Sequence, residues 1–270
     1  MEQEHGQARL DTALFSRGLA PSRAKARVLI ERGWVKVNGA PCLKPSRLVE
    51  AADEIQIAEN DELKYVSRGG FKLEKAIQVF ELDLRGKTVL DIGSSTGGFT
   101  DCALQHGANR VIAVDVGSDI MDARLRQDAR VELHERTDIR NFPVDQAGAV
   151  DVLTMDVSFI SVQRIVEVFK GIQGDFSVVC LIKPQFEVGR VQARKHKGVI
   201  RDGKLHRRAI EDVVNAFAIQ GFFLNGLSYS PITGGDGNIE YLALFRKRPA
   251  GLLPDVDEVI RLAHGAVGKA

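Results

Sequence analysis

The stretch Thr88-Val89-Leu90-Asp91-Ile92-Gly93-Ser94-Ser95-Thr96-Gly97-Gly98-Phe99-Thr100 leads from an apolar run into a glycine-rich turn and then into a helical pattern. Glycines allow the backbone to turn tightly and to approach a ligand closely, and a helix N-terminus favours polar or anionic groups. Strand, glycine turn and helix in this order are typical of nucleotide-type sites. The stretch therefore predicts a Rossmann-like fold with a ligand at the end of this strand.

The spacing of the glycines, at Gly93, Gly97 and Gly98, differs from the G-x-G-x-x-G of dinucleotide-binding folds. A second apolar run ends at Asp115, 22 residues after Gly93, where an acid can bind a ribose hydroxyl pair. We interpret the two features together as a site for S-adenosylmethionine, with Asp91 near its amino-acid end and Asp115 on its ribose. An ordinary α/β turn with two strand-end acids is the alternative.

Composition and cysteine spacing limit the class of protein. The 270 residues, 44% of them hydrophobic, can form one large domain or two unequal ones. No apolar run approaches the roughly 18 residues that cross a bilayer, and no signal peptide is recognisable. Cys42, Cys102 and Cys180 have neither metal-ligand spacing nor a disulfide framework. We expect a soluble, cytoplasmic protein with reduced cysteines, no metal, no membrane contact and no obligate protein partner.

From residue 65 onward, apolar runs alternate with helical patterns, which predicts a mostly parallel seven-stranded sheet with helices on both faces. Ligands bind beyond the carboxyl ends of such strands. Five successive runs end at polar residues, namely Asp91, Asp115, Asp138, Asp156 and Lys183. Asp138 could accept a hydrogen bond from an adenine amino group, and a loop acid that caps a turn is the alternative. The predicted cofactor-binding residues are Asp91, Gly93, Ser94, Ser95, Gly97, Gly98, Phe99, Asp115, Val116, Asp138 and Ile139.

A strongly basic segment follows the fifth strand. Between Arg190 and Arg208 eight basic residues stand against one acid, a net charge of +7. We expect a mobile loop that leads into a helix from Leu205 and binds RNA over the site, with a solvated loop as the alternative. A further helix is expected from Ser161 to Phe169.

The N-terminal segment is also basic. From Arg9 to Ala58 nine basic residues stand against five acids, a net charge of +4. Two helical patterns, an alternating run at 34–37 and the turn Asn38-Gly39 predict a small helix–helix–hairpin unit. Such a unit suggests phosphate-backbone binding, and a solvated basic surface is the alternative. We place this domain at 1–58, a polar linker at 59–64 and the second domain at 65–270.

The N-terminal unit resembles the S-four (S4) RNA-binding domain. The resemblance is carried by Arg9-Leu10-Asp11, Gly18, Ser22-Arg23, Ala26, Leu29-Ile30, Gly33, Val35-Lys36-Val37-Asn38-Gly39 and Lys44-Pro45. It implies an α+β domain whose basic helix rests on structured RNA and reads its shape. The predicted RNA-binding residues are Arg9, Arg23, Lys25, Arg27, Arg32, Lys36 and Lys44, with Arg68, Arg194, Lys195 and Lys197 in the second domain.

Residues 65–250 resemble the FtsJ-like ribose 2′-O-methyltransferases, and the whole chain resembles the TlyA (hemolysin A-like) family, which joins such a domain to an S4 domain. The resemblance is carried by Tyr65-Val66-Ser67-Arg68-Gly69-Gly70, Asp91 to Thr100, Asp156-Val157-Ser158-Phe159-Ile160-Ser161, Lys183-Pro184-Gln185-Phe186-Glu187 and Gly237-Asn238-Ile239-Glu240. It implies methylation of cytidine ribose in ribosomal RNA, with S-adenosylmethionine as donor and ribosomal subunits as partners.

The family's catalytic tetrad matches Lys72, Asp156, Lys183 and Glu240. By this resemblance Lys183 deprotonates or steers the 2′-oxygen, Asp156 and Lys72 orient it, and Glu240 completes the network. Methyl transfer to oxygen needs an acceptor hydroxyl that is held in line and loses its proton, and a desolvated lysine can act on that hydroxyl. The sequence leaves open which of the four is the formal base.

Three other functions compete with this interpretation. A nucleobase amino-methyltransferase requires Asn/Asp-Pro-Pro-Tyr after the fourth strand, where this chain has Asp156-Val157-Ser158-Phe159. A membrane-active haemolysin lacks support from any spanning segment. A non-catalytic RNA-binding module is disfavoured because all four tetrad positions are filled.

Overall fold

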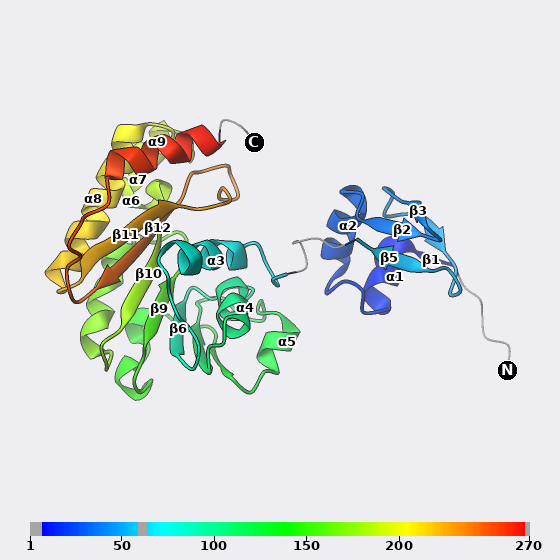
Figure 1. The fold of residues 1–270 in the computed structure, drawn as a ribbon, viewed down its shortest axis with the longest axis horizontal. Helices are drawn as coiled ribbons and strands as arrows, with labels where there is room; N and C mark the ends of the chain where they lie inside the picture. The colour runs from blue at the N-terminus through cyan, green and yellow to red at the C-terminus, as the bar shows by residue number, and fades with distance from the viewer. Residues whose placement is uncertain (1–6, 59–63, 268–270) are drawn as a thin grey trace. The chain divides into compact units, whose positions relative to one another are not determined.

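The computed structural model describes residues 7–58 and 64–267, and the chain divides into two compact units, Met1–Val66 and Ser67–Ala270 (Figure 1). All of the predicted linker except Lys64 lies outside the described residues. The predicted boundaries at residues 58 and 65 therefore remain predictions.

The first unit packs two helices against short antiparallel strands. Its helices are α1 (Leu10–Ser16) and α2 (Arg23–Glu31), and its strands are β1 (Ala8–Arg9), β2 (Val35–Val37), β3 (Ala40–Pro41), β4 (Leu48–Val49) and β5 (Ile55–Ile57). The strands pair as β3-β2-β5 and β1-β4. Ser22 caps α2, because its hydroxyl accepts the backbone N–H of Lys25 at 3.1 Å. The apolar stripe of α2, formed by Ala26, Leu29 and Ile30, is fully buried, so the predicted small α+β unit is confirmed.

The second unit contains a seven-stranded sheet in the order β11-β12-β10-β9-β6-β7-β8. Its strands are β6 (Thr88–Ile92), β7 (Arg110–Val114), β8 (Val131–His134), β9 (Val152–Met155), β10 (Ser177–Ile182), β11 (Phe223–Tyr229) and β12 (Tyr241–Arg246). The strands from β10 to β8 are parallel, whereas β12 runs antiparallel to both β10 and β11. This confirms the predicted mostly parallel, Rossmann-like sheet.

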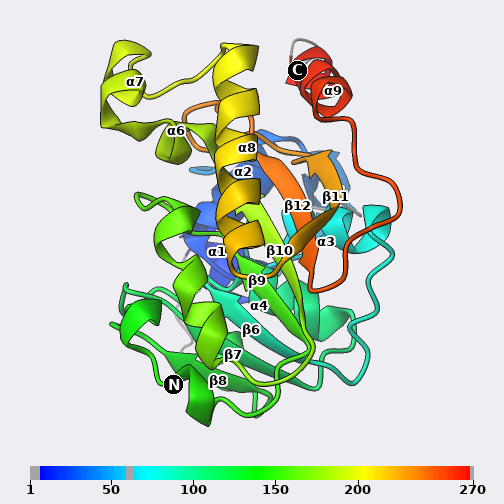
Figure 2. The same ribbon diagram turned by 90° about the vertical axis from the view of Figure 1, so that its left-hand side faces the viewer.

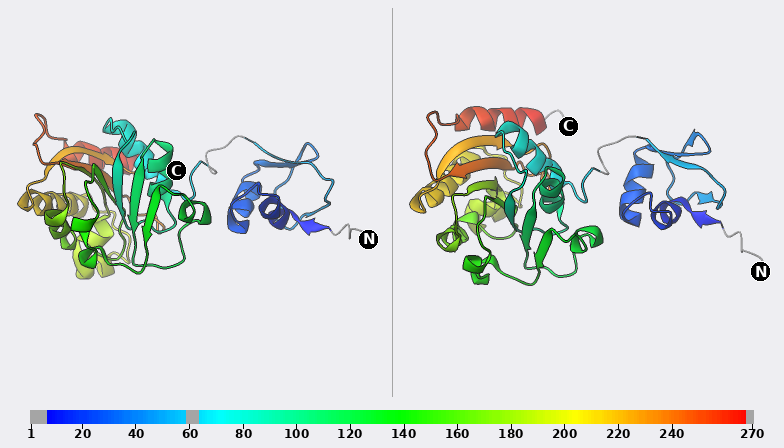
Figure 3. Two further views of the ribbon diagram at one scale, coloured as in Figure 1. Left: turned by 90° about the horizontal axis from the view of Figure 1, so that it is seen from below. Right: turned by 60° about the horizontal axis from the view of Figure 1, so that its bottom comes forward.

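Helices cover both faces of this sheet (Figures 2 and 3). The helices are α3 (Gly69–Val79), α4 (Gly98–Gln105), α5 (Ala123–Arg126), α6 (Pro184–Glu187), α7 (Gly189–Lys195), α8 (Gly203–Ile219) and α9 (Val256–Val267). Helix α8 packs on β10, β11 and α9, while α3 and α4 pack together on the opposite face (Figure 2). Every residue of β10 after Ser177 is buried, as expected for a central strand covered on both faces.

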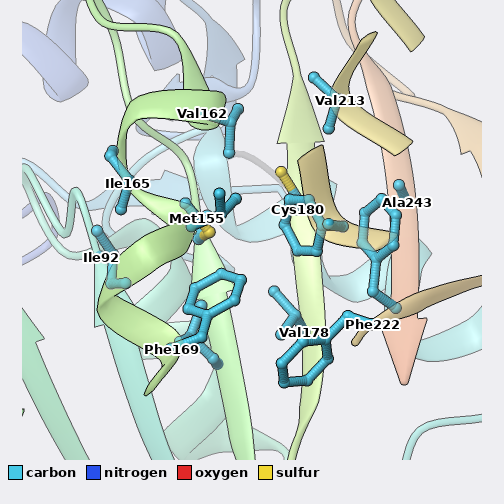
Figure 4. Packing of buried hydrophobic residues seen from close by; sticks show 14 of the residues in the cluster. Ile92, Met155, Val162, Ile165, Phe169, Val178, Cys180, Val213, Phe222 and Ala243 are labelled. Atoms are coloured by element: carbon cyan, nitrogen blue, oxygen red, sulfur yellow. The ribbon is translucent and has the colours of Figure 1, made fainter. Parts of the chain in front are cut away.

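The core under α8 is rich in aromatic residues (Figure 4). The rings of Phe217 on α8 and Phe245 on β12 are stacked with their centroids 3.8 Å apart. The ring centroid of Phe169 lies 5.3 Å from that of Phe217 and 5.4 Å from that of Phe222, which it meets edge to face. Cys180 lies fully buried in this cluster, and burial raises the pKa of its thiol. Cys42, Cys102 and Cys180 are all free and buried, so their side chains pack in the protein interior.

Two predictions of local structure are wrong. The expected helix at 161–169 is two 3₁₀ segments, η4 (Val162–Arg164) and η5 (Val166–Gly171), because Val162, Ile165 and Val166 are β-branched and a distant carboxylate binds the first turn. The basic segment is not a loop throughout, because it begins with α7 and enters α8 at Gly203.

Candidate active site

A cavity of about 940 Å³ lies at the carboxyl ends of the parallel strands, entirely within the second unit. Five segments line it: the start of α3, the glycine turn after β6, the segment after β9, the segment from Lys183 to α7, and the loop before β12. Since β12 is antiparallel to β10 and Tyr241 pairs with Ile182, the residue before β12 lies at the same sheet edge as the residue after β10. The topology therefore brings Glu240 next to Lys183.

The four residues of the predicted tetrad lie together in this cavity. Lys72 Nζ lies 2.7 Å from Glu240 Oε2 and 3.4 Å from Asp156 Oδ2. Lys183 Nζ lies 2.6 Å from Asp156 Oδ1 and donates a hydrogen bond to Ser158 Oγ at 2.8 Å. The four side chains thus form a chain of alternating charge, Glu240–Lys72–Asp156–Lys183, whose catalytic role remains a proposal.

Burial and charge act in opposite directions on Lys72. Desolvation alone would lower its pKa, but the attraction of Asp156 and Glu240 outweighs desolvation and the pKa is raised. The raised pKa favours the protonated form of Lys72. The carboxylates of Asp156 and Glu240 hold its ammonium group in place. This arrangement suits a positioning role better than the role of a base.

The glycine turn after β6 needs glycine for steric reasons at two of its positions. Gly93 has φ +82°, and a Cβ there would lie 2.8 Å from the carbonyl oxygen of Asp156. Gly97, the residue before α4, has φ +95°, and a Cβ there would lie 2.2 Å from the side chain of Leu125. The turn is thus held against the segment that carries Asp156. Within the cavity, the buried hydroxyl of Ser94 has no hydrogen-bond partner among the described residues.

Asp91 is placed differently from the prediction that it contacts the amino-acid end of a cofactor. It is fully buried, and its two oxygens accept the hydroxyl groups of Thr100 at 2.7 Å and Thr154 at 2.8 Å. Burial raises its pKa to about 6. Asp91 therefore fastens α4 and β9 to β6, and supports the glycine turn from inside.

Some of the other predicted cofactor residues line the cavity, and the rest lie beside it or away from it. The glycine turn lines the cavity through Gly93, Ser94, Ser95, Gly98 and Phe99. Asp115 lies beside this turn, where it accepts the backbone N–H groups of Ser95 at 2.8 Å and Gly117 at 2.7 Å. Val116 is 72% exposed and Ile139 is buried. Asp138 caps the 3₁₀ segment η2 (Ile139–Asn141) and pairs with Arg140, which matches the alternative of a capping acid, and its contact with adenine stays a prediction.

In the first unit, the predicted RNA-binding residues are arranged around one buried acid. Asp11 is buried and lies 2.9 Å from Arg9 and 3.5 Å from Arg23. Its hydrogen bond with Arg9 lowers the pKa of Asp11 to about 2. Of the remaining predicted residues of this unit, Lys25 is half-buried, whereas Arg27, Arg32, Lys36 and Lys44 are exposed. Such a surface can bind phosphates.

In the second unit, Arg68 lines the cavity, whereas Arg194, Lys195 and Lys197 lie on α7 or just after it, outside the cavity lining. The prediction missed two arginines that do line it, Arg164 and Arg190. Arg164 carries no local signal, because it ends the short 3₁₀ segment η4. Arg190 counted toward the basic segment but was not singled out within it.

Phe159 was also missed as a site residue. Its side chain is 93% exposed, lines the cavity, and lies with its ring centroid 5.4 Å from that of Phe186. Its backbone has φ +66°, an unfavourable conformation for a bulky residue. An exposed aromatic ring held by a strained backbone at a cavity indicates a binding function rather than a packing function.

Comparison with known proteins shows the family to which the chain belongs. The FtsJ-like methyltransferase profile matches residues 65–247, and the S4 domain profile matches residues 8–55. The chain belongs to the FtsJ-like methyltransferase family. Its predicted place among the TlyA (hemolysin A-like) proteins is also confirmed, because relatives that carry these names match it over most of its length.

Three relatives illustrate the match. YqxC of Bacillus subtilis, named as an rRNA methyltransferase, is 46% identical over 87% of this chain and 84% of its own length. The 16S/23S rRNA (cytidine-2′-O)-methyltransferase TlyA of Mycobacterium tuberculosis is 39% identical over 88% of this chain and 90% of its own. A solved structure titled as a hemolysin, from Streptococcus thermophilus, has a TM-score of 0.75 and 38% identity, and the match covers 98% of both chains.

Some of these relatives are named hemolysins, so the helices of this protein were compared with the length and apolarity that a membrane span requires. None of the helices within residues 7–58 and 64–267 is long and apolar enough to span a bilayer. Over the same ranges, no group of three or more His, Cys, Asp or Glu side chains is placed to hold a metal ion.

Proposed function

We propose that this protein transfers a methyl group from S-adenosylmethionine to the 2′-hydroxyl of a ribose, that of a cytidine, in ribosomal RNA. The observation that supports this most strongly is the chain Glu240–Lys72–Asp156–Lys183 beside the glycine turn. The names of the relatives supply the substrate class. An enzyme with this substrate meets ribosomal subunits in the cytoplasm.

The residues around the glycine turn fit S-adenosylmethionine. Gly93 and Gly98 line the cavity, and a Cβ at either would meet backbone or the hydroxyl of Ser67, so the absence of side chains lets the turn pack closely at the cavity wall. The unpartnered hydroxyl of Ser94 can bind a carboxylate or amino group, and Asp115 stands at the tip of β7 for a ribose. When bound, this cofactor supplies an electrophilic methyl group.

The tetrad is arranged to bind the acceptor hydroxyl and to assist the loss of its proton. Lys183 places a positive charge where the oxygen loses its proton, and so stabilises the negative charge that develops there. Asp156 lies between two lysines and keeps Lys183 directed into the cavity. Lys72 and Glu240 hold Asp156 in turn. Because Lys183 acts here as a cation, the proton of the acceptor hydroxyl leaves through Asp156 or solvent.

Phe159 and Phe186 offer a surface on which a base can stack. Single-stranded or extruded nucleotides are commonly bound by stacking on aromatic rings, at about 1 to 3 kcal/mol per base. A ribose can reach Lys183 only if its nucleotide leaves the RNA helix, so an exposed ring at the cavity suits this function.

The proposal is tested with purified protein, S-adenosylmethionine and ribosomal subunits from cells that lack the gene. We expect new 2′-O-methyl groups on cytidine, detected by mass spectrometry of RNA digests. Methylation of bases alone, or lysis of erythrocytes without methylation of any subunit, would contradict it.

Asp115→Ala is expected to weaken binding of S-adenosylmethionine. The variant loses a carboxylate on the ribose and the hydrogen bonds that hold Ser95 and Gly117, which together correspond to about 1.5 to 3 kcal/mol, or roughly 10- to 100-fold in affinity. Isothermal titration calorimetry measures this directly. An unchanged affinity would remove Asp115 from the cofactor site.

Phe159→Ala is expected to raise the KM for RNA about 5- to 150-fold, because one stacking interaction of about 1 to 3 kcal/mol is lost. Its affinity for S-adenosylmethionine should stay unchanged, and Phe159→Tyr should retain most of the activity. The removal of a strained, exposed ring should not lower the melting temperature. A normal KM for the alanine variant would show that the ring does not stack on the substrate.

A further inference from the structure

Arg164 of η4 and Arg190 of α7 line the cavity, and the side chains of both are exposed. Neither guanidinium has an ion pair or a side-chain hydrogen bond with another residue in the described part of the chain. The two cavity lysines, in contrast, are bound by carboxylates. Arg164 and Arg190 are therefore cationic groups that are available to a ligand, on segments other than the one that carries Arg68, and guanidinium is suited to bind phosphate.

Glu187 connects the two elements that carry these arginines. It is a buried carboxylate at the end of α6, and it accepts hydrogen bonds from three groups of the η4 segment. These donors are the Ser161 hydroxyl at 2.6 Å, the Val162 backbone N–H at 2.9 Å and the Gln163 side-chain amide at 3.2 Å. Arg164 follows Gln163 directly and Arg190 lies three residues after Glu187, so this one side chain fixes the relative position of both.

Charge in the cavity also favours an anion at these arginines. The two lysines and the carboxylates of Asp156 and Glu240 balance one another. The exposed acid Asp236 lines the cavity on the loop before β12, and disfavours an anion there. A ribose at Lys183 is flanked by two backbone phosphates, which need cations close to the catalytic groups but separate from them.

We propose that Arg164 and Arg190 bind the backbone phosphates next to the ribose that enters the cavity, and that Glu187 is a positioning residue that sets the distance between them. This inference rests on the proposed function. It adds to the catalytic groups a phosphate clamp formed by η4 and α7, which holds the target nucleotide in register with Lys183.

The arginines are tested with R164Q, R190Q, the double variant, and R261Q as the control, an exposed arginine on α9. Binding of an rRNA fragment is measured at several salt concentrations. Each single cavity variant should reduce the slope of log K against log[salt] by about 0.7 to 0.9, and the double variant by about twice as much. The KM for RNA should rise in parallel, while the affinity for S-adenosylmethionine stays unchanged. Slopes equal to that of R261Q would overturn the clamp.

Glu187 is tested with E187Q, which keeps the shape of the side chain but weakens its acceptance of three donors. The salt slope should stay at the wild-type value because both arginines remain, whereas the KM for RNA should rise with little change in kcat. A lower kcat at unchanged KM would overturn the positioning role, since it would place Glu187 in support of Lys183. Thermal unfolding of E187Q identifies any general loss of folding, and R164Q and R190Q then test the clamp independently.

Failure of the proposed function and failure of the phosphate clamp give different results. If the wild-type protein does not methylate ribose, the proposed function is wrong. If it methylates ribose and the arginine variants match R261Q in slope and KM, only the clamp is wrong.

Discussion

Lys183→Ala should lower kcat for methylation of ribosomal subunits by at least about 10²- to 10³-fold, the usual cost of removing a group that stabilises charge in the transition state. Lys183 follows β10 and is buried between Asp156 and Ser158. Its removal leaves Lys72, which is bound between Asp156 and Glu240, as the remaining cation of the tetrad. The polar partners of Lys183, Asp156 and Ser158, lie outside the glycine turn. Affinity for S-adenosylmethionine should therefore change by less than about threefold, which is within about 0.7 kcal/mol.

The experiment measures transfer of a labelled methyl group under saturating substrates, with calorimetry for the cofactor. Lys170→Ala is the matched control, because Lys170 is an exposed lysine of η5 outside the cavity lining. Lys183→Arg should recover little activity, since a planar guanidinium cannot replace a compact ammonium group between these partners. If Lys183→Ala methylates at the wild-type rate, the proposed mechanism is wrong.

Removal of residues 1–58 should reduce affinity for ribosomal subunits far more than affinity for S-adenosylmethionine. The removed segment carries a net charge of +4 between Arg9 and Ala58, and loss of several phosphate contacts costs on the order of 10- to 1,000-fold at physiological salt. The second unit has its own seven-stranded sheet and buried core, so its cofactor site should remain intact.

Filter binding or anisotropy measures the affinity for intact subunits, and calorimetry measures the affinity for S-adenosylmethionine. A finer variant of the full chain, with Lys36 and Lys44 both changed to glutamine, should keep the fold because both side chains are exposed, and should lower the salt slope by about 0.7 to 0.9 per lost contact. Equal activity of truncated and complete protein on intact subunits would refute a targeting role for the first unit.

Local patterns were sufficient for most of the architecture. The apolar runs ending at Asp91, Asp115 and Asp156 correspond to β6, β7 and β9, because a buried parallel strand is continuously apolar and stops at a polar residue. The helix after Ser22 was recognisable from its cap and its apolar stripe. These features depend on residues a few positions apart, so they can be predicted without the tertiary structure.

Predictions were wrong or incomplete where distant residues decide local conformation. The segment after Ser161 forms η4 under the influence of Glu187, which is 25 positions from Val162. Asp91 was expected to face a ligand, but Thr100 and Thr154 occupy its oxygens inside the core. The exposed ring of Phe159 depends on a backbone conformation that no sequence period indicates.

The sequence by itself determined the order of strands, glycine turn and helices, the basic N-terminal unit and the family, because these depend on periodicity, on backbone freedom and on short motifs. Only the tertiary structure decided which side chains meet. Lys72 and Glu240 are 168 positions apart and lie 2.7 Å from each other because β12 enters the sheet antiparallel beside β10, with α3 on the same edge. Which strands become neighbours in the sheet is set by packing of the whole sheet, and no local pattern contains it.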